Sequence, residues 1–253
     1  MTRAPKLPPP FSLVALESVD STNSEARRRA EAGAPDGTVV WARSQSAGRG
    51  RRGRAWQSPP GNLYASVLLR PDLDAADCAR LTFLVAVALG DALAGLLPPL
   101  ATIAHKWPND VLVNGRKCAG ILIESATSGG AFVDWLVIGV GVNLAHHPGD
   151  AEFPATDLAF EGAGEVTPEA ALEAFARHLL RWLDVWGQDG FAPVRAAWLA
   201  RAWRIGEPIE VRLDSRRLSG RFERLDDDGA LIVAHGDGSR TRIEAGAVFP
   251  PTP

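Results

Sequence analysis

One arginine- and glycine-rich stretch dominates the sequence: Gln45-Ser46-Ala47-Gly48-Arg49-Gly50-Arg51-Arg52-Gly53-Arg54-Ala55-Trp56. Glycine lets a backbone take positive φ and approach a ligand closely, and guanidinium groups donate paired hydrogen bonds to phosphate or carboxylate oxygens. The composition therefore predicts a loop that wraps an anion. A flexible arginine-rich surface loop and a nucleic-acid-binding tail share this composition, so the stretch alone leaves both alternatives open.

Both flanks of this stretch have strand character. Residues 38–42 are apolar and β-branched, and residues 63–69 form a second apolar run. The turn residues at 58–62 lie directly before the second run. The loop is therefore expected to connect two strands.

The remaining chain alternates helical and strand patterns. Helices are expected from about Thr22 to Gly33 and at residues 76–97, 168–187 and 191–203. Further strands are expected at residues 11–17, 102–107, 111–113, 119–124 and 132–142, and then at 209–213, 217–224, 230–234 and 239–244. Thr22 and Glu25 have the spacing of a capping box, and Asn114-Gly115 is a hairpin signal. The four or five short strands after residue 205 suit a small barrel.

Composition narrows the class of protein. The chain has 253 residues and a net charge of −3, so it lacks the overall basic field of a DNA-binding protein. Two cysteines, Cys78 and Cys118, give neither a disulfide framework nor a metal-binding spacing, which favours a reducing, cytoplasmic location. Residues 1–10 lack a signal-peptide core and are expected to be a flexible lead-in. The apolar run at residues 81–97 is too interrupted for a membrane span.

A second polar cluster is His105-Lys106-Trp107-Pro108-Asn109-Asp110, followed after the hairpin by residues 117–122, Lys-Cys-Ala-Gly-Ile-Leu. Lys106 is a point charge suited to a carboxylate or an α-phosphate, and Trp107 offers a flat face to a ring. An ordinary solvated turn is the alternative for this motif.

Five segments, in order, resemble the signature motifs of biotin protein ligases. They are residues 20–23 (Asp-Ser-Thr-Asn), residues 45–53 with Trp56, residues 106–110, residues 117–122 and residues 139–143 (Gly-Val-Gly-Val-Asn). The resemblance implies an α/β fold, a mixed sheet with flanking helices of the biotinyl/lipoyl ligase (class II synthetase-like) type, and a small C-terminal SH3-like barrel. The implied domains are a lead-in at 1–10, a catalytic domain at 11–204 and a barrel at 205–253.

The resemblance also implies a two-step reaction. Biotin and ATP give biotinyl-5′-AMP and pyrophosphate, and a lysine of a biotin carboxyl carrier protein, such as that of acetyl-CoA carboxylase, then takes the biotin. Mg²⁺ is expected with the nucleotide, and no metal held by the protein alone. We expect no repressor domain, no DNA, no membrane, and a monomer or weak homodimer. Where many relatives have Gly-Ile-Asp, the barrel has residues 223–229, Glu-Arg-Leu-Asp-Asp-Asp-Gly, which leaves its role open.

The resemblance to biotin protein ligases implies roles for the residues of this chain that match the family's motifs. Lys106 and Arg51 are expected to be catalytic. The residues expected to bind biotin are Ser21, Thr22, Asn23, Gln45, Arg49, Gly50, Arg51, Lys106, Lys117 and Gly120. Those expected to bind the nucleotide are Arg49, Arg51, Arg52, Trp56, Lys106, Asn109 and Asn143. The alternatives are a helix cap for Ser21, Thr22 and Asn23 and a core position for Trp56.

Two rival functions stay open. A lipoate or octanoyl transferase shares the implied fold, whereas the arginine loop with Lys106–Asp110 favours biotin. A non-catalytic nucleic-acid binder would use the arginine loop alone, and the net negative charge argues against it.

Overall fold

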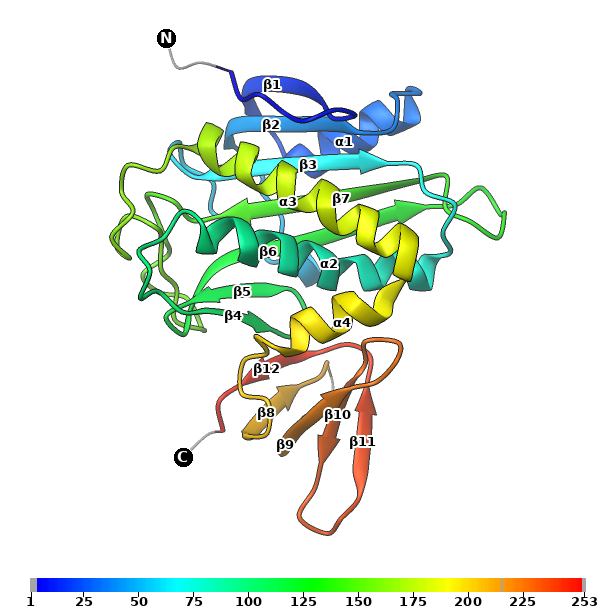
Figure 1. Cartoon of the computed structure of the whole chain (residues 1–253), viewed down its shortest axis with the longest axis vertical. Helices are drawn as coiled ribbons and strands as arrows, with labels where there is room; N and C mark the ends of the chain where they lie inside the picture. Colours follow the sequence, from blue (N-terminus) through cyan, green and yellow to red (C-terminus); the bar gives the residue numbers. More distant parts are fainter. Residues whose placement is uncertain (1–3, 215, 252–253) are drawn as a thin grey trace.

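The computed structural model describes residues 4–214 and 216–251, and this part of the chain contains two sheets (Figure 1). The larger sheet has seven strands in the order β1-β2-β3-β7-β6-β5-β4. Their bounds are β1 Ser12–Val19, β2 Thr38–Gln45, β3 Leu63–Leu69, β4 Ile103–Lys106, β5 Asp110–Val113, β6 Arg116–Ala126 and β7 Trp135–Val142. The β1–β2 pair is parallel and the other neighbouring pairs are antiparallel, so the sheet is mixed, as predicted.

Helices cover both faces of this sheet. α1 (Thr22–Glu31) is the crossover between the parallel strands β1 and β2, and it contacts β2, β3 and β7. α2 (Ala75–Ala94) and α3 (Pro168–Asp189) pack against each other on the opposite face (Figure 1). The end of the sheet at which α1 begins also carries the arginine loop, which follows β2.

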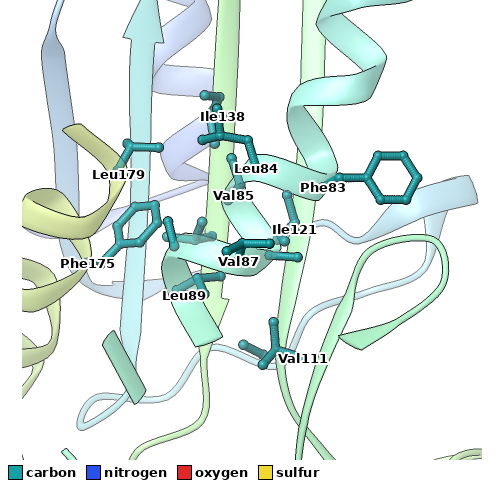
Figure 2. Packing of buried hydrophobic residues seen from close by; sticks show 14 of the residues in the cluster. Phe83, Leu84, Val85, Val87, Leu89, Val111, Ile121, Ile138, Phe175 and Leu179 are labelled. Carbon is teal, nitrogen blue, oxygen red and sulfur yellow. The ribbon is translucent and has the colours of Figure 1, made fainter. Parts of the chain in front are cut away.

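The main core lies between the sheet and helices α2 and α3. α2 is apolar over most of its surface because it is covered on one side by the sheet and on the other by α3. Figure 2 shows Leu84 and Val87 of α2 against Ile138 of β7 and Ile121 of β6, with Phe175 of α3 beside them. This packing gives the site a rigid support.

The smaller sheet forms the C-terminal barrel. Its order is β11-β10-β9-β8-β12, with all neighbours antiparallel. The strands are β8 Pro208–Arg212, β9 Arg217–Leu225, β10 Leu231–Ala234, β11 Arg240–Ile243 and β12 Ala247–Phe249. α4 (Phe191–Leu199) lies between the two sheets (Figure 1).

Most element predictions are confirmed, with shifted ends. The hairpin prediction is confirmed, since Asn114 and Gly115 both have positive φ (49° and 76°) between β5 and β6. The third strand of the sheet agrees residue for residue, whereas the strand expected from residue 132 begins at Trp135. The last barrel strand, β12, was not located by the sequence pattern.

The capping-box prediction is wrong. Ser21, and not Thr22, is the N-cap of α1, and it makes no side-chain cap hydrogen bond. Glu25 does not reach back to the helix start, because its carboxylate pairs with Arg28 and Arg29. The first turn is capped instead by Gln45 of β2, whose Oε1 accepts from the Thr22 N–H at 2.7 Å.

The structure describes the predicted lead-in from residue 4 onward. Residues 1–3 lie outside the described residues, and so do residues 252 and 253. Pro5 is buried, the Lys6 N–H donates to Glu173 of α3 at 2.7 Å, and Leu7 packs against the core. Residues 5–7 therefore pack against the part of the chain that contains the larger sheet. Within the described chain, no helix combines the length and apolar character of a membrane span.

Candidate functional site

A cavity of about 490 Å³ opens where α1 begins, between the arginine loop and the barrel. Every residue predicted for the site from the sequence lines it: Ser21, Thr22, Asn23, Gln45, Arg49, Gly50, Arg51, Arg52, Trp56, Lys106, Asn109, Lys117, Gly120 and Asn143. These side chains come from α1, the loop after β2, the β4–β5 turn, β6 and the end of β7. The fold therefore gathers all five sequence motifs at one place.

The inner end of the cavity is polar and uncharged at its surface. Thr22 Oγ1 donates to Gln45 Oε1 at 3.1 Å, and the fully buried Ser66 hydroxyl of β3 lies 2.7 Å from Asn23 Oδ1. Asn23 Nδ2 donates to Glu124 Oε2 at 2.7 Å. Because each polar group is held by a neighbour, donors and acceptors are fixed before a ligand arrives.

Strand register builds a glycine floor beside this polar end. Gly120 of β6 is paired with Asp110 of β5 on one side and with Gly141 of β7 on the other. The Trp56 ring lies on the two glycines: a Cβ at Gly141 would be 2.5 Å from Trp56 Cε2, and one at Gly120 would be 3.0 Å from Cζ3. Trp56 is half-buried and its indole N–H has no hydrogen-bond partner. The glycines are needed for this ring to lie flat on the sheet.

The arginine loop closes one side of the cavity through ion pairs and hydrogen bonds. Arg49 Nη2 contacts Glu124 Oε2 at 3.0 Å, and Arg51 Nη1 donates to Asn109 Oδ1 at 3.2 Å. Arg52 has φ 56° within the short 3₁₀ turn Arg51–Gly53. Its Nη1 lies 3.0 Å from Asp214 Oδ1 in the barrel.

Arg51 is half-buried, and its surroundings shift its pKa. Burial lowers the pKa of Arg51 from its ordinary value, and the neighbouring Arg52 lowers it further, while Asp110 acts in the opposite direction. A guanidinium this basic stays protonated throughout the physiological range. Arg51 is therefore a cation that an anionic ligand would stabilise.

Two lysines share one carboxylate at the charged end. Lys106 Nζ lies 3.3 Å from Asp110 Oδ2, and Lys117 Nζ lies 2.7 Å from Asp110 Oδ1. Burial lowers the pKa of Lys106 below its ordinary value, and Asp110 opposes this effect. For Asp110, burial raises the pKa, but Lys117 and Lys106 together outweigh burial and hold it below the ordinary value. The group carries one positive charge in excess.

Aromatic rings surround the Lys106 ammonium. Its Nζ is 4.6 Å from the centre of the Phe153 ring and 5.3 Å from that of Phe249, the last residue of β12. Ring faces attract a cation that has lost its water shell. The barrel therefore contributes to the charged end of the cavity.

Asn143, at the end of β7, is buried and hydrogen-bonded to the backbone. It is 4% exposed, and its Nδ2 donates to Thr156 O at 3.0 Å. The side chain lines the cavity but already has one partner in the β7–α3 segment. Its role toward a nucleotide stays a prediction.

Comparison with known proteins gives two family matches. Residues 7–200 match the model described as "Biotin/lipoate A/B protein ligase family", and residues 205–249 match "Biotin protein ligase C terminal domain". The chain belongs to the biotin/lipoate A/B protein ligase family.

Individual ligase relatives resemble nearly the whole chain. It is 46% identical to "Biotin--[acetyl-CoA-carboxylase] ligase" of Paracoccus denitrificans over 92% of this chain and 98% of the relative. It is 33% identical to "Bifunctional ligase/repressor BirA" of Bacillus subtilis over 89% and 70% of the two chains. Among solved structures, the Aquifex aeolicus biotin protein ligase in complex with biotin and ATP superposes with TM-score 0.78 at 26% identity, covering 94% and 97%.

Several residues of this ligase-family site escaped the sequence interpretation. Asp110 stands in a motif that was recognised, yet its pairing with two lysines became visible only from the strand register. Glu124 lies on β6, the strand that carries Lys117, and contacts both Asn23 and Arg49. Phe153 and Phe249 are isolated aromatics in irregular or short segments and give no local signal.

The arrangement can bring two anions together. A neutral, preorganised polar end with a flat apolar floor adjoins an end that carries Lys106, Lys117 and the arginine loop. A ligand with an uncharged ring at one end and a carboxylate at the other would place its carboxylate among these cations.

Proposed function

We propose that this member of the ligase family is an ATP-dependent biotin protein ligase. It activates biotin as biotinyl-5′-AMP and transfers the biotinyl group to a lysine of a carrier protein. The single observation that carries the proposal is the continuity of one cavity from the polar Thr22–Asn23–Gln45 end to the cationic Lys106 end.

In the first step a carboxylate oxygen of biotin attacks the α-phosphorus of ATP. The bond between the α-phosphorus and the bridging oxygen breaks, and pyrophosphate leaves with the electron pair. Two anions must approach one another, and the repulsion is reduced by fixed cations in a site of low dielectric. Lys106 and Arg51 serve this purpose, with Asn109 holding the Arg51 guanidinium in place.

In the second step the amine of the acceptor lysine attacks the acyl carbon of biotinyl-5′-AMP. A carbon–nitrogen bond forms, the carbon–oxygen bond to AMP breaks, and the amine loses a proton. The arginine loop keeps water from the mixed anhydride until the acceptor arrives. The partner is a biotin carboxyl carrier domain, and the name of the Paracoccus relative indicates that of acetyl-CoA carboxylase.

Mg²⁺ enters as part of the ATP substrate in this proposal. No group of three or more His, Cys, Asp or Glu side chains with metal-binding spacing occurs among residues 4–214 and 216–251. Asp110, the most deeply placed carboxylate of the site, is already neutralised by two lysines. Phosphate oxygens would therefore supply most ligands to the ion. The cytoplasmic location and the monomer or weak homodimer stay predictions.

The contacts of the arginine loop disfavour the nucleic-acid alternative. Arg49, Arg52 and Arg54 contact Glu124, Asp214 and Glu152, so the loop lies on its own protein. The lipoate alternative is disfavoured by the polar end of the cavity, because a lipoyl dithiolane ring has no hydrogen-bond donors or acceptors to match it. Biotin's ureido ring has both.

The test is pyrophosphate release by the purified protein with ATP, Mg²⁺ and either biotin or lipoate, followed by mass measurement of a carrier domain. Biotin-dependent release and a carrier heavier by one biotinyl group support the proposal. Release with lipoate alone would contradict it.

Lys106→Ala tests the catalytic assignment in the same assay. We expect adenylation to fall at least about 100-fold, in line with the loss of one preorganised charge at a reacting group. Lys6→Ala is the matched control, since Lys6 is exposed, contacts α3 through its backbone and does not line the cavity. Near-normal adenylation by Lys106→Ala would remove Lys106 from the catalytic residues.

A further inference from the structure

The barrel touches the turn that carries Lys106. Trp107 follows Lys106 directly, is 2% exposed and does not line the cavity. Its indole N–H donates to the carbonyl oxygen of Gly229 at 3.2 Å. Gly229 belongs to the β9–β10 turn, residues 226–230, so one hydrogen bond joins the barrel to the side chain of the residue that follows the lysine.

The β9–β10 turn is internally fixed. Asp226 Oδ1 accepts from the N–H groups of Asp228 at 2.9 Å and Ala230 at 2.8 Å. Gly229 has φ +84°, and a Cβ there would lie 2.6 Å from Phe83 Cε2 of α2. The position therefore admits only glycine without a shift of the turn.

Arginines of the catalytic domain hold the same turn from outside. Arg195 of α4 contacts Asp227 at 2.9 Å and donates to Leu225 O at 2.8 Å. Arg80 of α2 pairs with Asp228. The turn is thus tied to α2 and α4 by side-chain contacts as well as to Trp107.

A second barrel group contacts Lys106 itself. The centre of the Phe249 ring lies 5.3 Å from the ammonium and 3.9 Å from the Arg212 guanidinium. The barrel therefore contacts Lys106 at its ammonium through β12 and its neighbour Trp107 through the β9–β10 turn.

We propose that the β9–β10 turn of the barrel is a positioning element of the adenylation site, acting on Lys106 through the Trp107 indole. This inference rests on the proposed function, because it assigns the reaction step that the turn supports. None of residues 226–230 lines the cavity, whose polar end is built from α1, β2, β6 and β7, so we expect biotin binding to be independent of the turn.

Gly229→Ala is the decisive variant, and Gly238→Ala is its matched control. Gly238 lies in the β10–β11 turn of the same barrel with φ +85°, but a Cβ there meets nothing within 4 Å. Both changes impose the same backbone strain, whereas only Gly229→Ala displaces the carbonyl that Trp107 binds. Trp107→Phe is a second variant, since it removes the donor and leaves the backbone of the turn unchanged.

For each folded variant, the biotin dissociation constant and the turnover number for pyrophosphate release are measured. We expect Gly229→Ala and Trp107→Phe to lower the turnover number at least tenfold with biotin affinity within twofold of the unmodified protein, and Gly238→Ala to change neither. Turnover within twofold for Gly229→Ala and Trp107→Phe would overturn the proposal. A parallel loss of biotin affinity would also overturn it, because that result indicates general disruption.

A second readout does not depend on the ligase activity. Lys106 acylation by an amine-reactive ester is followed by peptide mass spectrometry, with Lys6 as the internal reference. Freed from the turn, Lys106 of Gly229→Ala is expected to react at least threefold faster than in the unmodified protein, and an unchanged rate contradicts the proposal. Should the unmodified protein release no pyrophosphate with biotin, the proposed function fails while this readout still decides the positioning role.

Discussion

At the scale of single residues, glycines decide the shape of the cavity floor beside its polar end. Gly120 and Gly141 face each other across β6 and β7, and Trp56 rests on both. Gly139 has a similar function, since a Cβ there would lie 2.0 Å from Asn23 Oδ1. Their role is steric, because all three lie in extended strands where any residue could adopt the backbone conformation.

Gly141→Ala is expected to weaken biotin binding at least tenfold. The added methyl group would displace the Trp56 ring from the floor, since its carbon would lie 2.5 Å from Trp56 Cε2. Titration calorimetry with biotin measures the change. Gly149→Ala, in a loop with open space around the new Cβ, is the control. Equal affinity for both variants would show that the ring does not define the pocket.

Arg51→Gly is expected to leave adenylation measurable while biotinyl-5′-AMP escapes faster. The variant removes the guanidinium that links the loop to Asn109 and makes the loop more flexible. The rate of loss of preformed intermediate from the protein, followed by rapid filtration, checks the result. Retention equal to that of the unmodified protein would contradict a closing role for Arg51.

At the scale of elements, β4 is joined to α2 and α4 at His105. This side chain is fully buried, and its Nδ1 lies 3.2 Å from Trp198 O. Gly90 of α2 makes room for the ring, since a Cβ there would be 2.7 Å from Nε2. Arg201 and Asp91, which pair with each other, are the charged groups near it.

Acid should therefore destabilise the fold through His105. Burial lowers the pKa of His105 to about 4 from an ordinary value of 6.5, with Arg201 acting in the same direction and Trp198 O opposing. The unfolded chain binds this proton first, so the stability is complete above pH 6.5 and is lost as pH falls toward 4. The free energy of unfolding should fall by about 2 kcal/mol between pH 7 and pH 5 from this group.

Urea unfolding at several pH values measures this loss. His105→Gln should have a flatter pH dependence than the unmodified protein, whereas His235→Gln, in the barrel, should keep the original slope. Identical slopes for all three proteins would exclude His105 as the group responsible.

The positions of most strands and helices could be predicted from the sequence. Alternating and periodic patterns located nearly every strand and helix, because those patterns report burial on one or both faces. The predicted site residues all line the cavity. They could be recognised from the sequence because their side chains suit the binding of an anion or of a polar ring. The pairing of Gly120 with both Asp110 and Gly141, and the approach of Phe249 to Lys106, depend on register and on packing between distant segments. No local pattern encodes those contacts.

At the scale of the whole molecule, the arginine loop and the barrel are connected. Arg52 contacts Asp214 at 3.0 Å, and Arg54 and Arg212 share the carboxylate of Glu152. The loop is thereby held from the barrel side as well as from the sheet side. Because these pairs are largely exposed, salt should weaken them.

Asp214→Asn is expected to raise the dissociation rate of biotinyl-5′-AMP by less than about fivefold, the range for one exposed ion pair. The increase should shrink at high salt, where the unmodified protein loses the same pair by screening. Stopped-flow release at two salt concentrations measures both effects. Asp237→Asn, an exposed barrel carboxylate that contacts Ser239, is the control. A salt-independent difference would refute the electrostatic explanation.

The glycine floor limits how substitutions can change the acid that the pocket accepts. A pocket bounded by side chains can be widened by trimming one of them, but Gly120 and Gly141 have nothing left to trim. Any side chain introduced at these two positions can only push the Trp56 ring away from the sheet and into the cavity. Acceptance of a bulkier acid must therefore begin elsewhere, at the indole itself or through a displacement of whole strands, and the sheet behind the floor makes the latter costly.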